Sequence, residues 1–427
     1  MSKVLARVIG ITLLVQIFAF FIGVGNNVIL SRWLGPELLG VFASIIVVIE
    51  LIYKLVNPGL DTSAIYFISN KQYDFKKYIS TYFINSVAVL LIGIIVLYAL
   101  PDIKILSFLY EDINLNIFSD NFKIIAFYFF ALLYYEFGVK VPLGLQQFKS
   151  YNKIQIVKPV LFFILLIGSS QIFDPGINII LILVGISSLI PSLFYWKLAL
   201  PFRILWDKEI TKKSLSYGFK VMLGGILQFL NYRADILLIT FFLTRIEVGW
   251  YYVSVLIAER LLFLTQATAT ILMPAASSSE IQREKTPILS RLNFTVVLAG
   301  SLIIALSAYW VIPLLFSEEY SKSVLPLIFI LPGIICLSVS KLLSADLSSR
   351  GLPQYTTYVS ILNFFLNITL NLILIPSLGI AGAAISSSIS YSAALIFLGY
   401  YYKKLTSISI TDLLLLRKGD LEKIKFV

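Results

Sequence analysis

The chain has 427 residues, of which 59% are hydrophobic and only 13% are charged, and its mean hydropathy is +0.91. This composition excludes an ordinary soluble globular protein and is typical of a protein whose helices span a membrane. The net charge of +11 would suit a nucleic-acid partner, but most of the basic residues lie in the segments between long apolar runs. We therefore expect a polytopic, all-α membrane protein with no nucleic-acid partner.

A helix needs about 20 mostly apolar residues to cross the hydrocarbon core of a bilayer. Twelve stretches meet this requirement, near residues 8–30, 38–67, 79–100, 122–143, 154–173, 177–198, 217–243, 249–273, 288–316, 325–347, 355–375 and 381–402. They lack the period-two alternation of a β-barrel. The first run follows Lys3 and Arg7 and is too long for the apolar part of a signal peptide, so we expect it to be retained as a span.

Lysine and arginine concentrate in every second connecting segment, which sets the orientation by the positive-inside rule. The opposite segments offer only Arg32, Lys104, Arg245 and Lys322. This bias predicts that both termini and the connector near residues 201–216 lie in the cytoplasm, which requires an even number of spans.

The second half of the chain weakly repeats the first. Residues 26–50 align with 235–259 at an offset of 209, and residues 176–178 align with 379–381 at an offset of 203. Because each half holds six spans, the two copies have the same orientation, and parallel repeats place the substrate path between the halves. We expect an N-lobe over residues 1–200, a connector over 201–216, a C-lobe over 217–402 and a basic cytoplasmic tail over 403–427.

Several short motifs occur along the chain in a fixed order. They are LSRWLGPELLGVFA at residues 30–43, EVGWY at 247–251, Met273-Pro274, NLILIP at 371–376 and GIAGAA at 379–384. In this order the chain resembles the polysaccharide (O-antigen) repeat-unit flippases of the multidrug/oligosaccharidyl-lipid/polysaccharide (MOP) exporter superfamily. The resemblance implies two six-helix bundles with the architecture of multidrug and toxic compound extrusion (MATE) transporters.

The same resemblance implies a function and its partners. The protein would move undecaprenyl-pyrophosphate-linked oligosaccharides from the cytoplasmic to the outer leaflet of the cell membrane by alternating access, as a secondary transporter. Its partners would be this lipid-linked substrate, membrane lipids, a coupling H+ or Na+, and polysaccharide assembly proteins. No cofactor is implied.

Ionisable side chains inside a span cost about 2.5 to 3.5 kcal/mol on insertion scales, so they normally face a cavity or a partner. The cations that we expect to bind the diphosphate in a basic cavity are Arg233, Arg260, Lys54 and Lys341. The acids that are candidates for coupling to an ion are Glu50, Glu259, Asp235 and Glu136. We expect Asp235 to be more structural, so that Asp235→Asn would strand a buried partner charge and lower protein abundance.

Each charged group also has a structural interpretation. Glu50 with Lys54 and Glu136 with Lys140 have the i,i+4 spacing of an ion pair on one helix face. Residues 233 and 235 point about 200° apart on a helix, so they need separate partners, and a salt bridge across the lobe interface would satisfy the arginine.

Two other functions remain open. A multidrug or peptidoglycan-precursor exporter would share the architecture. A polytopic glycosyltransferase or polymerase is less favoured, because the longest outer segment, Pro101–Asn121, is short and the sequence has neither an Asp-x-Asp motif nor a glycine-rich phosphate loop. We therefore expect a transporter with no catalytic residues and no metal site.

Overall fold

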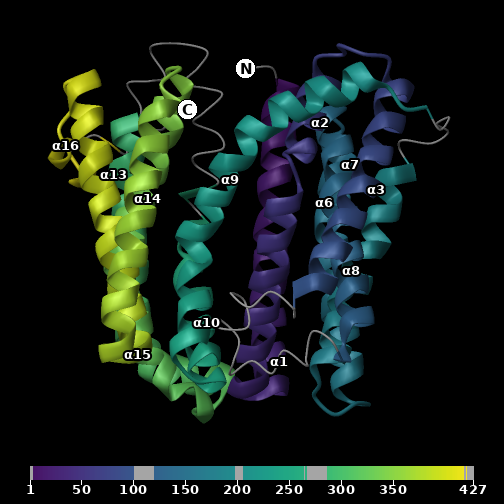
Figure 1. Ribbon diagram of the computed structural model, residues 1–427. Helices are drawn as coiled ribbons and strands as arrows, with labels where there is room; N and C mark the ends of the chain where they lie inside the picture. The colour runs from purple at the N-terminus through teal and green to yellow at the C-terminus, as the bar shows by residue number, and fades with distance from the viewer. Residues whose placement is uncertain are drawn as a thin grey trace. The chain divides into compact units, whose positions relative to one another are not determined.

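The computed structural model describes residues 3–100, 120–197, 205–263, 265–266, 286–417 and 420, with the backbone alone for residues 3–13 (Figure 1). Every regular element in these ranges is a helix. The segment 101–119 and the Met273-Pro274 motif lie outside them. Nine of the described helices are long and apolar enough to cross a membrane.

Two of these nine helices contain two spans each. α1 (Lys3–Val56) and α15 (Pro353–Thr406) each have 54 residues, about 80 Å of helix, which far exceeds a hydrocarbon core of about 30 Å. Each is interrupted by a glycine with non-helical backbone angles, Gly35 (φ 68°) in α1 and Gly379 (φ 60°) in α15. Together with α10 (Arg245–Arg260), which covers the first part of the expected eighth span, the described residues account for all twelve expected spans.

The interruptions fall at equivalent positions of the sequence repeat. Gly35 aligns at the offset of 209 with Thr244, which caps the start of α10. Gly379 aligns at the offset of 203 with Gly176, which directly precedes α8 (Ile177–Lys197). The expected fold class, two six-helix bundles built from parallel repeats, is confirmed.

The first unit, residues 1–226, packs around α6. Its helices after α1 are α2 (Leu60–Ser69), α3 (Phe75–Ala99), α6 (Phe122–Gly144), α7 (Phe148–Ser170) and α8. α6 contacts each of the other five. Gly93 allows α3 to approach closely, because a methyl group there would lie 2.3 Å from the ring of Phe129 on α6.

The second expected span, residues 38–67, is not one continuous helix. It is broken at Asn57-Pro58-Gly59, between the end of α1 and the start of α2. Proline lacks the donor needed to continue the helix, Gly59 adopts φ 70°, and the side-chain oxygen of Asn57 accepts a hydrogen bond from the backbone N–H of Leu60 at 3.1 Å. The break therefore creates a new helix start inside the span.

The second unit, residues 227–427, packs around α14. Besides α10 and α15 it contains α13 (Thr286–Phe316), the 3₁₀ helix η2 (Glu318–Ser323), α14 (Val324–Ser349) and the short α16 (Thr411–Leu414). α14 contacts α10, α13 and α15. Large apolar side chains on α13, such as Ile303, Leu306 and Trp310, are exposed, as expected for a surface that faces lipid.

The structure divides the chain into its two units at residue 226. α9 (Lys208–Phe242) begins inside the expected connector and crosses the division at residue 226. Its first turns belong to the first unit. The ring of Tyr217 stacks on the ring of Tyr66, with the ring centres 4.7 Å apart. The backbones at Gly218 and Gly59 are also in close contact, because a methyl group added at Gly59 would lie 2.2 Å from the Gly218 carbonyl oxygen. Just before α9, an ion pair of 2.6 Å with Lys77 lowers the pKa of the Asp207 carboxyl.

The expected tail is also part of a folded unit. α15 continues to Thr406, and Leu413 of α16 is fully buried in one hydrophobic cluster with Leu398 and Tyr402. A methyl group at Gly399 would lie 2.4 Å from Ile410. Residues 403–417 therefore pack on the second unit rather than forming a separate tail.

Candidate functional site

A group of charged side chains in the first unit surrounds the start of α2. The helix break places Asp61 in the first turn of α2, where a negative charge is favoured by the helix dipole. Asp61 is 8% exposed, and its Oδ2 accepts a hydrogen bond from the Tyr53 hydroxyl at 3.3 Å and lies 3.9 Å from Lys140 Nζ. Lys140 is also 3.6 Å from Glu136, so the expected i,i+4 ion pair is confirmed.

Two further lysines lie over aromatic rings of this unit. Lys54 Nζ is 5.3 Å from the centre of the Tyr53 ring, and Lys158 Nζ on α7 is 4.2 Å from that of Tyr135. The carboxylates of Glu136 and Glu50 both attract the Lys158 ammonium group. Lys158 was missed in the sequence analysis, although a lysine followed by proline within an apolar run is a visible signal.

In the second unit, Arg233 and Glu259 form a two-pronged ion pair between α9 and α10. The Arg233 nitrogens donate to Glu259 Oε1 at 2.8 Å and Oε2 at 3.1 Å. Thr244 and Glu247 form a reciprocal capping box that begins α10 soon after α9 ends, and this brings Glu259 beside Arg233. The carboxylate partner of Arg233 thus lies in the same lobe, whereas the structural interpretation assumed a bridge across the lobe interface.

Glu259 forms an ion pair with Arg233 and also interacts electrostatically with two other cations. Its carboxylate attracts the Lys341 ammonium group and the Arg260 guanidinium as well as Arg233. Lys341 Nζ also lies 5.1 Å from the centre of the Tyr232 ring. Arg233 and Glu259 are 26% and 28% exposed. The structure therefore brings together three of the four expected cations, with one carboxylate among them, in a group that we call the cation cluster; Lys54 lies in the other unit.

Asp235 is buried on a different side of α9. It is 4% exposed and accepts hydrogen bonds from the Tyr251 hydroxyl, from the backbone N–H of Ile236 at 2.8 Å and from the Ser387 hydroxyl at 3.5 Å. The expectation that Arg233 and Asp235 have separate partners is confirmed. Among the described residues the hydrogen-bond donors to Asp235 are neutral, which argues against the expectation that Asp235→Asn strands a partner charge.

Three asparagines on α15 extend this buried polar region. Asn363, Asn367 and Asn371 are 8%, 2% and 0% exposed. Asn371 donates to Asn367 Oδ1 at 2.9 Å, and Asn367 donates to the Ser387 hydroxyl at 3.4 Å. Among the described residues, the side-chain oxygens of Asn363 and Asn371 are buried without a donor. The spacing of four residues was visible in the sequence, but these uncharged side chains were not considered as site residues.

Comparisons with known proteins place the chain in a family. The sequence profile described as Polysaccharide biosynthesis protein matches residues 29–325. Over 182 residues the chain is 24% identical to the probable low-salt glycan biosynthesis flippase Agl15 of Haloferax volcanii, a match that covers 41% of the chain and 38% of that relative.

Solved structures with the same fold are transporters. One is the lipid II flippase MurJ in an inward closed conformation, with a TM-score of 0.75, 14% identity and coverage of 94% of this chain and 88% of that one. Another is an inward-facing multidrug resistance MATE transporter of the MOP superfamily, with a TM-score of 0.75, 15% identity and coverage of 93% and 97%. The expected MOP-type fold is confirmed. Because the family profile matches well over half of its length, this multi-pass membrane protein belongs to the polysaccharide biosynthesis protein family.

Proposed function

We propose that the protein is a flippase that moves an undecaprenyl-pyrophosphate-linked oligosaccharide from the cytoplasmic to the outer leaflet of the cell membrane, as a secondary transporter that works by alternating access. The observation that carries this proposal is the match to a polysaccharide biosynthesis family on a fold shared with a lipid flippase and a multidrug transporter. The similarity to a glycan biosynthesis flippase supports the glycan as the cargo.

The cation cluster is the proposed site for the diphosphate. Three cations around one carboxylate leave an excess of positive charge, and a guanidinium can hold phosphate oxygens with two hydrogen bonds. Partial exposure of Arg233 and Glu259 leaves the group accessible to a ligand. Lys54, which lies in the first unit, stays a separate candidate for contact with the substrate.

Asp235 is the best-supported candidate for ion coupling. Its carboxylate is buried within a span, and hydrogen bonds connect it through Ser387 and Asn367 to Asn371, whose side-chain oxygen has no donor among the described residues. A buried carboxylate connected to such a polar network can take up H+ or Na+. Glu259 is less suited to this role because Arg233 neutralises it. Glu50 and Glu136 remain candidates in the first unit.

A deletion strain tests the function. Without the protein, diphosphate-linked glycans should accumulate in the cytoplasmic leaflet, and the full chain should clear them. The double variant Arg233→Ala with Lys341→Ala should fail to clear them at equal membrane levels, whereas Arg417→Ala, which removes an exposed arginine elsewhere, should succeed. If the glycans stay normal in the deletion strain and it instead becomes sensitive to cationic drugs or accumulates peptidoglycan precursor, the proposed cargo is wrong.

A further inference from the structure

A cavity of about 410 Å³ lies in the first unit where α2 and α6 end and α3 begins. Its size is within the range of small-molecule sites. Aromatic rings form much of its wall, and the side chains of Ser69, Lys71 and Gln146 line it from the ends of α2 and α6; Lys71 and Gln146 are the long polar ones. Because α3 and α6 are long and apolar enough to span a membrane and the cavity lies where α6 ends and α3 begins, we infer that it lies at the level of the lipid headgroups.

The two polar residues occupy backbone positions that normally favour glycine. Lys71 follows α2 with φ 51°, and Gln146 follows α6 with φ 56°. Both helices end in a Schellman motif: the N–H groups of residues 71 and 72 donate to the carbonyls of 68 and 67, and those of 146 and 147 donate to 143 and 142. A left-handed conformation is unfavourable for L-residues with a Cβ. Lys71 and Gln146 therefore adopt a backbone conformation that costs free energy, and glycine at either position would avoid this cost.

The aromatic wall is fixed by its own contacts. The ring of Phe67 lies 5.7 Å from Tyr73 and 5.9 Å from Tyr78, and the two tyrosine rings are stacked at 6.3 Å. Behind the wall, α2 and α6 are in close contact, because a methyl group at Gly144 would lie 2.8 Å from Ile68. The cavity is therefore preformed.

The lining indicates the chemistry of the ligand. Lys71 is exposed, and among the described residues its ammonium group has no carboxylate within ion-pair distance, so it is available to an anion. The Gln146 amide can donate to and accept from hydroxyl groups, and aromatic faces pack against the C–H faces of a sugar or glycerol. A phosphate, hydroxyl groups and a compact carbon skeleton occur together in lipid headgroups.

We propose that this cavity binds the phosphorylated polyol headgroup of a membrane lipid, with Lys71 on the phosphate and Gln146 on the hydroxyls. Two lipids carry this chemistry: an anionic glycerophospholipid, and the diphosphate-linked glycan, in which case the proposal rests on the proposed function and the cavity is an entry site. The test must separate these two sources.

Because both residues have a left-handed backbone, glycine can replace them without strain, and the test uses this substitution. In the double variant Lys71→Gly with Gln146→Gly, both side chains are removed and the backbone conformation becomes easier to adopt, so thermal stability should stay equal or rise. Ser407→Gly is the matched control, because Ser407 also has a positive φ of 63° and lies outside the cavity. Lys76→Ala controls for the loss of one exposed positive charge near the same helix ends.

Binding of two defined probes to the purified full-length chain is then measured by native mass spectrometry: dioleoyl-phosphatidylglycerol and undecaprenyl-diphospho-N-acetylglucosamine. The double glycine variant should bind at least one probe about tenfold more weakly or worse, while both controls bind like the wild type. The probe that is lost identifies the source of the headgroup. Unchanged binding of both probes by the stable double variant would overturn the proposal. If the wild-type protein binds a probe at the cavity but does not clear the accumulated glycans from the cytoplasmic leaflet of the deletion strain, the proposed function is contradicted instead.

Discussion

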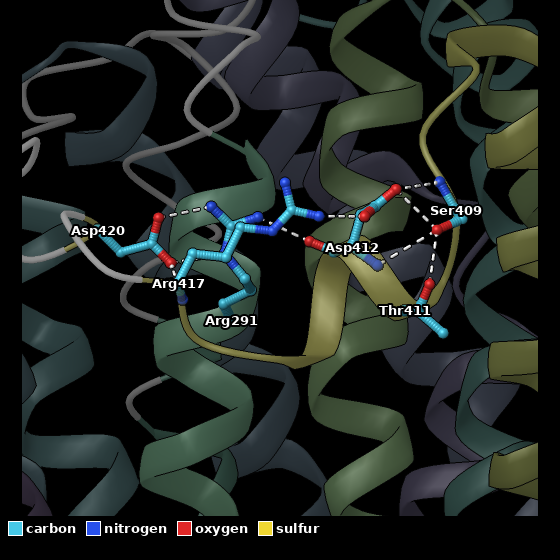
Figure 2. Close-up of polar contacts among 6 residues, drawn as sticks. All are labelled: Arg291, Ser409, Thr411, Asp412, Arg417 and Asp420. Carbon is cyan, nitrogen blue, oxygen red and sulfur yellow. Dashed lines mark hydrogen bonds and ion pairs between the residues drawn. The ribbon is translucent and has the colours of Figure 1, made fainter.

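The ion pair between Arg291 and Asp420 should account for much of the stability of the segment that follows α15. Figure 2 shows Arg291 on α13 pointing at Asp420 and at the backbone of Asp412. The Arg291 Nε and one terminal nitrogen donate to the two Asp420 oxygens at 2.7 Å each, and the other terminal nitrogen donates to the Asp412 carbonyl at 2.7 Å. The two side chains are only 7% and 4% exposed.

Removing one partner of such a pair leaves a buried charge without compensation. We expect Arg291→Ala to lower the free energy of unfolding of the second unit by about 3–5 kcal/mol. The control is Arg417→Ala: Arg417 pairs with Asp412, but the two side chains are 59% and 37% exposed, so the loss should stay below about 1 kcal/mol.

Denaturant unfolding of the purified protein, followed by a probe in the second unit, measures both changes. The double variant Arg291→Met with Asp420→Leu should recover most of the loss, because replacing a buried pair by apolar side chains of similar volume is often neutral. If Arg291→Ala shifts the unfolding midpoint no more than Arg417→Ala, then the pair does not hold the segment and the reasoning fails.

Three other predictions concern orientation, coupling and flexibility. In a protein with Cys336 replaced by serine, Lys208→Cys should be protected from an impermeant thiol reagent added outside intact cells; labelling from outside would reverse the predicted topology. Asp235→Asn should keep membrane abundance within about twofold, because its hydrogen-bond donors are neutral, and should abolish the dependence of transport on an ion gradient; full coupling would exclude Asp235. If α9 bends at its paired glycines during transport, Gly224→Ala with Gly225→Ala should slow transport without loss of stability, because a methyl group at either position meets no atom of the described residues within 4 Å and alanine favours the helix by about 1 kcal/mol per residue. Unchanged transport would show that α9 does not bend there.

The membrane spans could be predicted from the sequence, because the length of an apolar run depends only on neighbouring residues. The gaps between the expected spans, residues 31–37 and 376–380, contain the interruptions that the structure shows at Gly35 and Gly379. The break at Asn57-Pro58-Gly59 was not predicted, because the apolar run continues through it and proline is common within membrane helices. Asp61 was missed for the same reason: it becomes part of the charged group only through that break.

The site was less predictable because its contacts join distant parts of the chain. The asparagines of α15 carry no charge, and only the fold brings them near Ser387 and Asp235. Arg291 and Asp420 are 129 residues apart, and no local pattern relates them. The partners of a buried polar group are decided by tertiary packing, whereas the sequence shows only that a partner is needed.

The Arg233–Glu259 ion pair suggests how a transporter can hold a cation for an anionic cargo while the cargo is absent. An unpaired guanidinium inside a span would be costly, and the two hydrogen bonds to Glu259 remove that cost. In the proposed function, a diphosphate that enters the cation cluster would take over one or both of these hydrogen bonds, so that Arg233 would exchange one anion for another. Because the Glu259 carboxylate also attracts Lys341 and Arg260, Glu259 would keep cationic neighbours after Arg233 had turned to the diphosphate.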